Sequence, residues 1–327
     1  MNTVQFALLY HKKLIDKIIF PREVFTYQRT IQIDLTELNI KVEDMYLTTR
    51  LNKDISVFNF IEPYVSAKFL PYLEYHIADH CNLNCHACGH CSSLVKEPVF
   101  PVLEKMINDF EQFHKFIDDF GIIRIMGGEP LLNPDINEYV KLNRRLYPLA
   151  DIRVVTNAIL LPKMSEDFFE TLRKNNVSVD ISVYPPMRSK IPGIQNLLQS
   201  KGIKIGIGSV SRDEFFKNKR LKPVSNIREA FFQNCKGKVC NTMYDGKIAV
   251  CMSPFMNKYF NAYFNQNFPT DGYIDLYDES TTTEKIVRHL LKPIKDCVHC
   301  GKTQIIKWKQ IKHPVALSDW VTDVAAD

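Results

Sequence analysis

The sequence predicts an α/β fold in which strand–helix units build a parallel sheet, compatible with a whole or partial (β/α) barrel. Three observations support this. Strand and helix patterns alternate from residue 72 to 210, five strand patterns precede residue 211, and the pattern changes after residue 222. Such alternation implies right-handed βαβ units. In a barrel of this kind the chemistry lies at the carboxyl ends of the strands.

The elements follow in order along the chain. Short apolar runs that end near glycine or turn residues predict strands at residues 72–80, 121–126, 151–157, 177–184 and 203–210. Apolar residues at helical spacing predict helices at residues 102–120, 136–147, 165–175 and 191–200. Ser165 is the expected N-cap of the third helix.

The chain divides into three expected parts. Residues 1–70 hold short mixed apolar runs and form a small α/β preamble of unassigned role, and residues 71–222 hold the partial barrel. Residues 223–327 form a smaller module. Its predicted elements are a hairpin at 241–250 around Asp245-Gly246 and a helix at 281–292 with Thr281 and Glu284 at capping-box spacing.

Composition narrows the class of protein. The 327 residues are 45% hydrophobic and 24% charged, which is typical of a globular chain. A scattered net charge of +5 gives no reason to expect a nucleic-acid partner. We find neither an apolar run that could span a bilayer nor a signal peptide, so we expect a cytoplasmic protein without a membrane partner. Nine cysteines at short spacings favour metal ligation over disulfides.

The first cysteine group directly follows the first barrel strand. Cys81, Cys85 and Cys88 have C-x3-C-x2-C spacing. Thiolates at such spacings on one loop can hold an iron–sulfur cube. A cube has four irons, so three thiolates leave one iron open, and an open position distinguishes a catalytic metal from a structural one.

This motif after the first strand of an α/β barrel resembles the radical S-adenosylmethionine (radical SAM) superfamily. The resemblance implies a partial (β/α)6-type TIM barrel. A zinc site or a redox cluster that uses Cys91 as a fourth ligand is the alternative. We favour Cys91 as a bystander, and His86 and His90 as loop residues rather than ligands. The family often has an aromatic residue near adenine just before the third cysteine; here that residue is Ala87, so the contact must come from elsewhere.

A second motif, Gly127-Gly128-Glu129-Pro130, ends the second strand. Two glycines let a ligand approach the backbone closely, and the adjacent carboxylate can accept hydrogen bonds from an ammonium group. The resemblance implies that Gly127, Gly128 and Glu129 hold the amino group of the cofactor's methionine part. We expect Glu129 to lie in a turn with little packing to lose. Simple turn chemistry is the alternative.

Polar residues also end the third and fourth strands. They are Thr156 with Asn157, and Ser182 with Tyr184. Similar positions in the family contact the ribose and carboxylate of the cofactor. Capping and turn chemistry is the alternative for these residues.

A second cysteine group lies in the C-terminal module. Cys251 closes the predicted hairpin, and Cys297 and Cys300 form C-x2-C after the last helix. The order resembles the twitch auxiliary domain of radical SAM enzymes, a short form of the SPASM domain, in which four thiolates complete a second 4Fe–4S cluster. The fourth ligand is Cys235 or Cys240, and we favour Cys235. A structural zinc site is the alternative.

The resemblance also implies a reaction. A reductant such as flavodoxin or ferredoxin reduces the first cluster, S-adenosylmethionine is cleaved, and the resulting 5′-deoxyadenosyl radical abstracts hydrogen from a substrate C–H bond. The short module favours a small carbohydrate or cyclitol-like substrate that undergoes dehydrogenation, epimerisation or dehydration. The alternatives are a peptide-modifying maturase and a non-enzymatic electron-transfer protein with two clusters.

Overall fold

The structure is a computed structural model of the chain. It describes residues 68–205, 210–211, 214–231, 235 and 240–324. It also describes the backbone of an antiparallel pair near the N-terminus, β1 (Thr3–Tyr10) and β2 (Lys13–Pro21). Apart from residues 68–70, the rest of the predicted preamble lies outside the described residues.

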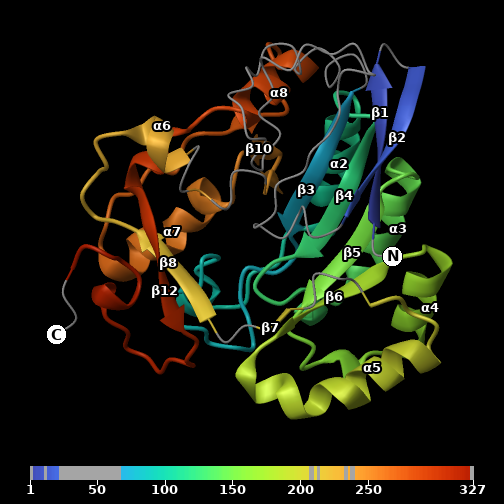
Figure 1. The fold of residues 1–327 in the computed structure, drawn as a ribbon, viewed down its shortest axis with the longest axis horizontal. Coiled ribbons are helices and arrows are strands. Elements are labelled where there is room, and N and C mark those ends of the chain that lie inside the picture. The colour runs from blue at the N-terminus through green and yellow to red at the C-terminus, as the bar shows by residue number, and fades with distance from the viewer. Residues whose placement is uncertain are drawn as a thin grey trace.

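A mixed sheet of eight strands forms the centre of the molecule, in the order β11-β10-β9-β3-β4-β5-β6-β7. Its parallel part was predicted from the alternation of patterns. These strands are β3 (Phe69–His76), β4 (Asp119–Met126), β5 (Asp151–Thr156), β6 (Ser178–Val183) and β7 (Val210–Ser211). Consecutive strands are hydrogen-bonded neighbours, which confirms the partial-barrel prediction (Figure 1).

Helices connect the parallel strands and cover one face of the sheet. They are α2 (Leu103–His114), α3 (Ile136–Leu146), α4 (Glu166–Lys174) and α5 (Ile191–Ser200). Short 3₁₀ turns fill several connections: η3 (Ser92–Leu94), η4 (Pro130–Leu132), η5 (Leu161–Lys163) and η6 (Pro185–Lys190). Ser165 caps α4 as predicted, because its side chain accepts a hydrogen bond from the Phe168 backbone N–H.

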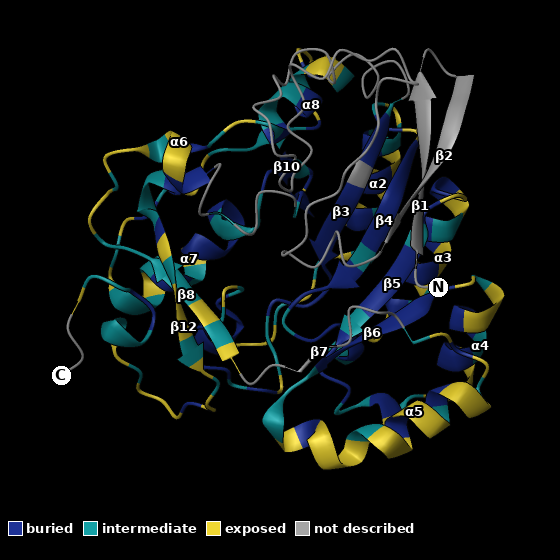
Figure 2. Ribbon diagram, viewed as in Figure 1, coloured by how far each residue is buried: buried dark blue, intermediate teal, exposed yellow. Residues whose placement is uncertain are grey.

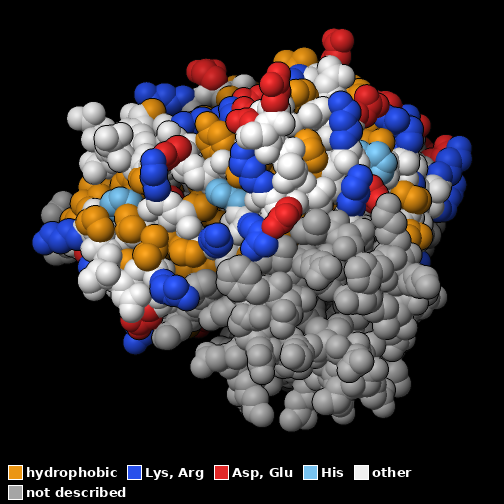
Figure 3. All heavy atoms as spheres, turned by 90° about the horizontal axis from the view of Figure 1, so that it is seen from above, with side chains coloured by type: hydrophobic (Ala, Val, Ile, Leu, Met, Phe, Trp, Pro, Cys, Tyr) orange, Lys and Arg blue, Asp and Glu red, His pale blue; other side chains and the backbone are white. Residues whose placement is uncertain are grey.

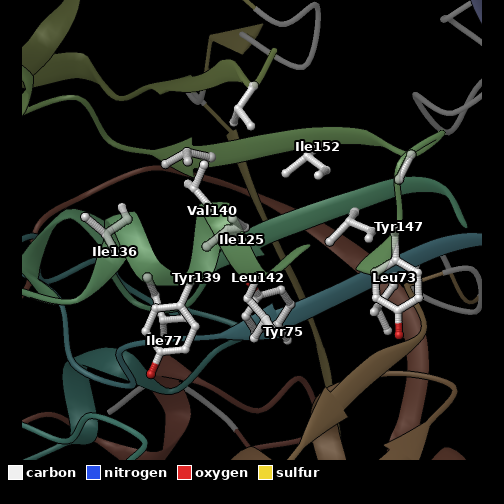
Figure 4. Packing of buried hydrophobic residues seen from close by; sticks show 14 of the residues in the cluster. Leu73, Tyr75, Ile77, Ile125, Ile136, Tyr139, Val140, Leu142, Tyr147 and Ile152 are labelled. Atoms are coloured by element: carbon white, nitrogen blue, oxygen red, sulfur yellow. The ribbon is translucent and has the colours of Figure 1, made fainter. Parts of the chain in front are cut away.

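The main core lies between the sheet and these helices. Alternate strand residues such as Tyr75, Ile125 and Ile152 point toward α3 and meet Tyr139 and Val140 (Figure 4). All five side chains are completely buried, and the central strands are dark in the burial view (Figure 2). Because strand side chains alternate between faces, the residues next to these point to the opposite, concave face.

Several predicted boundaries are wrong by a few residues. The first strand, predicted over 72–80, is Phe69–His76. The helix predicted over 102–120 ends at His114, and Asp119 already begins β4. Asp119 accepts hydrogen bonds from the backbone of Phe120 and Leu149, so it fixes the start of the strand. The last helix, predicted over 281–292, spans Thr283–Leu290, and its N-cap is Thr282 rather than Thr281, because the Thr282 side chain accepts from the Lys285 backbone N–H.

One predicted strand is described only in part. Of residues 203–210, Ile205 forms a bridge with Val179, and Val210 begins β7. Residues 206–209 lie outside the described residues.

The predicted hairpin is present and extends the central sheet. It comprises β9 (Thr242–Tyr244) and β10 (Lys247–Ala249), and β11 (Ile274–Asp275) pairs with β10. Asp245 and Gly246 both have positive φ angles, 51° and 70°, as a two-residue hairpin turn of this hand requires. β9 pairs in parallel with β3, so the hairpin attaches the C-terminal cysteine region to the barrel sheet.

Among the remaining C-terminal elements, the helices and turns are α6 (Ile227–Glu229), α7 (Ser253–Phe264), α8 (Thr283–Leu290), η8 (Lys295–His299) and η9 (Leu317–Asp319). β8 (Glu214–Lys219) pairs antiparallel with β12 (Cys300–Lys307). α8 packs into the main core through Ile286, Val287 and Leu290, and a second core forms around α7. Phe255, Met256, Phe260 and Trp320 form much of this core together with Cys91 from the first cysteine loop.

On the face shown in Figure 3, basic and acidic side chains are interspersed over the described part. In the part of the chain that the structure describes, no helix is long and apolar enough to cross a membrane.

Candidate functional site

The first cysteine group lies on the loop that leaves β3. Cys85 is buried, whereas Cys81 and Cys88 are half-buried. Burial raises the pKa of all three thiols, that of Cys85 to about 12, and their mutual repulsion adds to the effect at Cys81 and Cys85. Three thiols with raised pKa values near one another favour a bound cationic centre, because it stabilises their thiolate form.

The arrangement of the donors bears on the kind of metal group. Among the described residues, no set of three His, Cys, Asp or Glu side chains is arranged to hold a single metal ion. A zinc ion needs four ligands at about 2.0–2.3 Å. Thiolates alone do not choose between zinc and an iron–sulfur cluster.

The two glycines of the second motif pack against the cysteine loop itself. A Cβ atom added to Gly127 would lie 2.1 Å from the Ala78 carbonyl oxygen, and one added to Gly128 would lie 2.2 Å from that of His80. The Gly128 N–H donates to the Ala78 carbonyl at 2.7 Å. We expected these glycines to admit a ligand. In the structure they admit the backbone that precedes Cys81.

Glu129 is the centre of a buried hydrogen-bonded group. Its carboxylate accepts from Thr156 Oγ1 at 2.6 Å, from the Asn157 N–H at 2.9 Å and from the Leu131 N–H at 3.1 Å. The side chain is fully buried, and burial raises its pKa to about 7 in spite of these bonds. The expectation that Glu129 has little packing to lose is therefore wrong, because three donors depend on its carboxylate.

Pro130 supports this arrangement. It is buried and is the first residue of η4, the short turn that Glu129 caps through the Leu131 N–H. Its ring presets the φ angle that the first position of a helical turn needs.

Asn157 joins the glycine motif to the cysteine loop. Its side-chain amide donates to Asn82 Oδ1 at 2.7 Å and lies 3.7 Å from Cys81 Sγ. Thr156 and Asn157 are 2% and 4% exposed at the end of β5. The structure thus brings together the ends of three strands, which sequence spacing alone did not show. Asn82 was not among the predicted residues, and its type carries no distinct signal on a polar loop.

Aromatic side chains from the end of β6, from β8 and from the segment after β12 lie close together. Ser182 is buried, and the Tyr184 ring centroid lies 5.9 Å from that of Trp308 and 6.1 Å from that of Phe215. Trp308 Nε1 donates a hydrogen bond to Cys85 Sγ at 3.2 Å. Sequence reasoning missed Trp308, because only the fold places residue 308 beside residue 85.

Cys91 and the two loop histidines have protein partners. Cys91 is 2% exposed and packs in the second hydrophobic core with Leu94 and Trp320. His86 Nε2 lies 3.0 Å from Asp319 Oδ1, and His90 Nδ1 lies 2.8 Å from His76 Nε2. These contacts support the interpretation of all three as structural residues, which stays a prediction.

The four cysteines favoured for the second group influence one another. Burial raises the pKa of Cys251, of Cys297 to about 12, and of Cys300, and the neighbouring Cys235 thiol adds to each shift. Asp296 acts in the same direction on all three. Cys235 therefore lies within electrostatic range of Cys251, Cys297 and Cys300, and the choice between Cys235 and Cys240 stays a prediction.

A comparison with protein families identifies the domain that contains the first cysteine group. Residues 75–186 match the family model described as "Radical SAM superfamily". Residues 75–186 form a radical SAM domain. This radical SAM domain contains the first cysteine group, the glycine motif and both polar strand ends, whereas the second cysteine group lies beyond the match. The match and the relatives described next indicate that the chain is an enzyme.

Curated relatives match part of the chain. A GTP 3′,8-cyclase of Sulfurovum sp. (strain NBC37-1) is 30% identical over 148 residues, which are 42% of this chain and 44% of the relative. The GTP 3′,8-cyclase of Thermodesulfovibrio yellowstonii is 35% identical over 118 residues, 34% of this chain and 35% of the relative. The chain thus spans less than half the length of these relatives.

Solved structures also resemble the chain. One is BtrN in complex with AdoMet and 2-DOIA, with a TM-score of 0.42 and 15% identity over 72% of this chain and 93% of BtrN. Another is anSMEcpe with bound AdoMet, with a TM-score of 0.33 and 20% identity over 42% of each chain.

Proposed function

We propose that Cys81, Cys85 and Cys88 hold a 4Fe–4S cluster that binds S-adenosylmethionine, and that the chain uses it for hydrogen abstraction. The observation that carries the proposal is the junction of Glu129 with Asn157, since Asn157 in turn reaches Cys81. Through Asn157, the carboxylate that is expected to bind an ammonium group is connected to the loop that is expected to bind the cluster. A structural turn needs no such junction.

Residues of the site have separate tasks in this proposal. The Glu129 carboxylate, with Gly127 and Gly128 beside it, accepts the cofactor's ammonium group. Burial raises the Glu129 pKa to about 7, so a bound cation would stabilise the ionised form that the protein alone holds weakly. Thr156 and Asn157 orient that carboxylate, and with Ser182 and Tyr184 they are the proposed ribose and carboxylate contacts.

The chemistry itself belongs to the bound groups, and the protein controls its surroundings. When bound, the reduced cluster and S-adenosylmethionine supply a 5′-deoxyadenosyl radical that removes hydrogen from a substrate C–H bond. The chain's part is to keep water away from the site. The low exposure of Glu129, Thr156, Asn157 and Ser182 supports this part. The electron comes from a reductant such as flavodoxin or ferredoxin.

A second 4Fe–4S cluster on Cys235, Cys251, Cys297 and Cys300 belongs to the proposal. The mutual influence of these thiols supports it. The segment 223–327 would then be a twitch-like auxiliary domain attached to the radical SAM domain through the hairpin.

The proposed substrate is a small carbohydrate or cyclitol-like molecule. The concave face of the sheet supports it, because it carries a buried polar layer. Arg124 and Arg153 lie 3.5 and 3.4 Å from Asp180, and Glu74 accepts from the Tyr72 hydroxyl at 2.8 Å. Among the described residues, Arg124 Nε and Asp180 Oδ1 are buried without a hydrogen-bond partner. A ligand rich in hydroxyl groups could satisfy both a donor and an acceptor.

The curated relatives favour a second candidate, a purine nucleoside triphosphate, because two of them are named GTP 3′,8-cyclase. The two arginines of the concave face would then meet phosphate groups. Incubation of the reduced enzyme with GTP and with cyclitols, followed by mass spectrometry of the products, separates the two candidates.

The central test is anaerobic reconstitution followed by reduction with dithionite. We expect about eight irons per chain and release of 5′-deoxyadenosine from S-adenosylmethionine. A reconstituted protein that binds iron and sulfide but releases no 5′-deoxyadenosine contradicts the proposed function.

A further inference from the structure

A C-terminal segment pairs with the first cysteine loop. After β12 the chain runs antiparallel to that loop, with a bridge between Cys85 and Gln310. The His86 N–H donates to the Lys309 carbonyl at 3.0 Å, and the Ile311 N–H donates to the Asn84 carbonyl at 2.9 Å. These backbone bonds fix the position of Trp308 relative to Cys85. Figure 1 shows β12 on the side of the molecule where the cysteine loop lies.

The only polar atom of the Trp308 side chain, the indole Nε1, points to a proposed cluster ligand. Its Nε1–H donates to Cys85 Sγ at 3.2 Å, within the distance limit for a hydrogen bond to sulfur. Cys85 is 4% exposed, so little water competes for the sulfur. Indole nitrogen is a donor only and does not change charge between pH 5 and 9. The bond is therefore a permanent feature of the sulfur's surroundings.

We propose that Trp308 is a positioning residue that raises the reduction potential of the first cluster through its Nε1–H···Sγ hydrogen bond to Cys85. This inference rests on the proposed function, because it needs a cluster on Cys85. A reduced cluster carries one more negative charge than an oxidised one. A donor to its ligand sulfur stabilises the reduced state more, and hydrogen bonds to the sulfurs are known determinants of such potentials.

The electrostatics of Cys85 agree with this role. Burial raises its thiol pKa to about 12, and the hydrogen bond from Trp308 acts in the opposite direction by favouring the negative form of the sulfur. The donor and the acceptor lie 223 residues apart. The C-terminal part of the chain thus takes part directly in the surroundings of the first cluster.

The chain contains its own matched control. It has two tryptophans, and both donate to the cysteine loop. Trp320 Nε1 donates to the Cys88 backbone carbonyl at 3.3 Å rather than to a sulfur. The substitution of either tryptophan by phenylalanine removes one N–H and keeps an aromatic ring, but only Trp308→Phe removes a bond to a ligand sulfur.

The experiment is an anaerobic redox titration of the holoenzyme followed by electron paramagnetic resonance. The signal that changes on addition of S-adenosylmethionine identifies the first cluster. For Trp308→Phe we expect a more negative midpoint potential, by about 59 mV if the reduction constant falls tenfold. For Trp320→Phe we expect a clearly smaller shift. An unchanged or more positive midpoint in Trp308→Phe, or equal shifts in both variants, overturns the proposal.

A second measurement does not depend on how the variants fold. The parent protein is labelled with ¹⁵N at the indole nitrogens, and the reduced first cluster is examined by pulsed electron paramagnetic resonance. We expect a hyperfine coupling to one ¹⁵N nucleus, and its absence overturns the proposal. A parent with no cluster signal overturns the proposed function as well, whereas a parent that cleaves S-adenosylmethionine without this coupling overturns the Trp308 role alone.

Discussion

The two cysteine groups of this chain are built differently. The first occupies one loop, from Cys81 to Cys88. This loop leaves β3 and is held beside the ends of β4 and β5, where Glu129 accepts a hydrogen bond from the Asn157 N–H. The second collects thiols spread along the chain from Cys235 to Cys300, of which Cys297 lies in η8 and Cys300 begins β12. Closing a longer loop costs more conformational entropy. The first group can therefore be positioned by the completed sheet, whereas the second comes together only once the C-terminal elements have assembled.

The largest expected effect tests the first site. Cys81→Ala, Cys85→Ala or Cys88→Ala should each abolish 5′-deoxyadenosine release, because each removes a ligand that no other thiol of the loop replaces. Iron analysis should show about four irons fewer per chain. Cys91→Ala is the control and should retain the cluster spectrum, since Cys91 packs in the second hydrophobic core. Loss of the first cluster in Cys91→Ala would show that it is a fourth ligand.

The next effect tests the second site. Cys297→Ser should remove the auxiliary cluster and lower the unfolding temperature of the C-terminal part, because binding free energy at such a site is also folding free energy. Cleavage of S-adenosylmethionine should persist, and absorption and thermal unfolding measure the two changes. Cys240→Ser is the matched control, expected to keep both clusters. If Cys240→Ser loses the auxiliary cluster and Cys235→Ser keeps it, the assignment of Cys235 is wrong.

Substitutions of Glu129 can distinguish its expected role in cofactor binding from its role in stabilising the fold. Glu129→Ala should lower the free energy of unfolding by on the order of 3 kcal/mol, because buried donors from Thr156, Asn157 and Leu131 lose their acceptor. Chemical denaturation measures this loss.

Glu129→Gln is the matched control, because it keeps an acceptor oxygen and the shape of the side chain. It should be more stable than Glu129→Ala and still bind S-adenosylmethionine roughly ten- to a hundred-fold more weakly, since about 1.4 kcal/mol is tenfold. Unchanged affinity in Glu129→Gln would mean that Glu129 serves the fold alone.

The smallest effect tests the hairpin that joins the two regions. Gly246 has φ = 70°, and an added Cβ would lie 2.9 Å from Tyr277 Cε2. Gly246→Ala should therefore destabilise the protein by about 1 kcal/mol or somewhat more. Gly193 lies in α5, and an added Cβ meets nothing within 4 Å, so Gly193→Ala should be neutral or slightly stabilising. Equal stability of the two variants would contradict the strain argument.

Local sequence patterns were enough to predict the order of the elements and to single out the first candidate ligands. Periodicity identified the parallel strands, the helices between them and the hairpin at Asp245-Gly246, because these signals are local. The short spacing of Cys81, Cys85 and Cys88 needed no fold to interpret. The family match then confirmed the radical SAM domain in which they lie.

The tertiary structure decided what distant segments do to one another. It showed that Gly127 and Gly128 pack on the cysteine loop, that Glu129 is fully buried, and that Trp308 reaches Cys85. It also joined the hairpin to β3 and so extended the barrel sheet into the C-terminal region. No local pattern carries this information, because burial and hydrogen bonding at a residue depend on side chains that are neighbours only after the chain has folded.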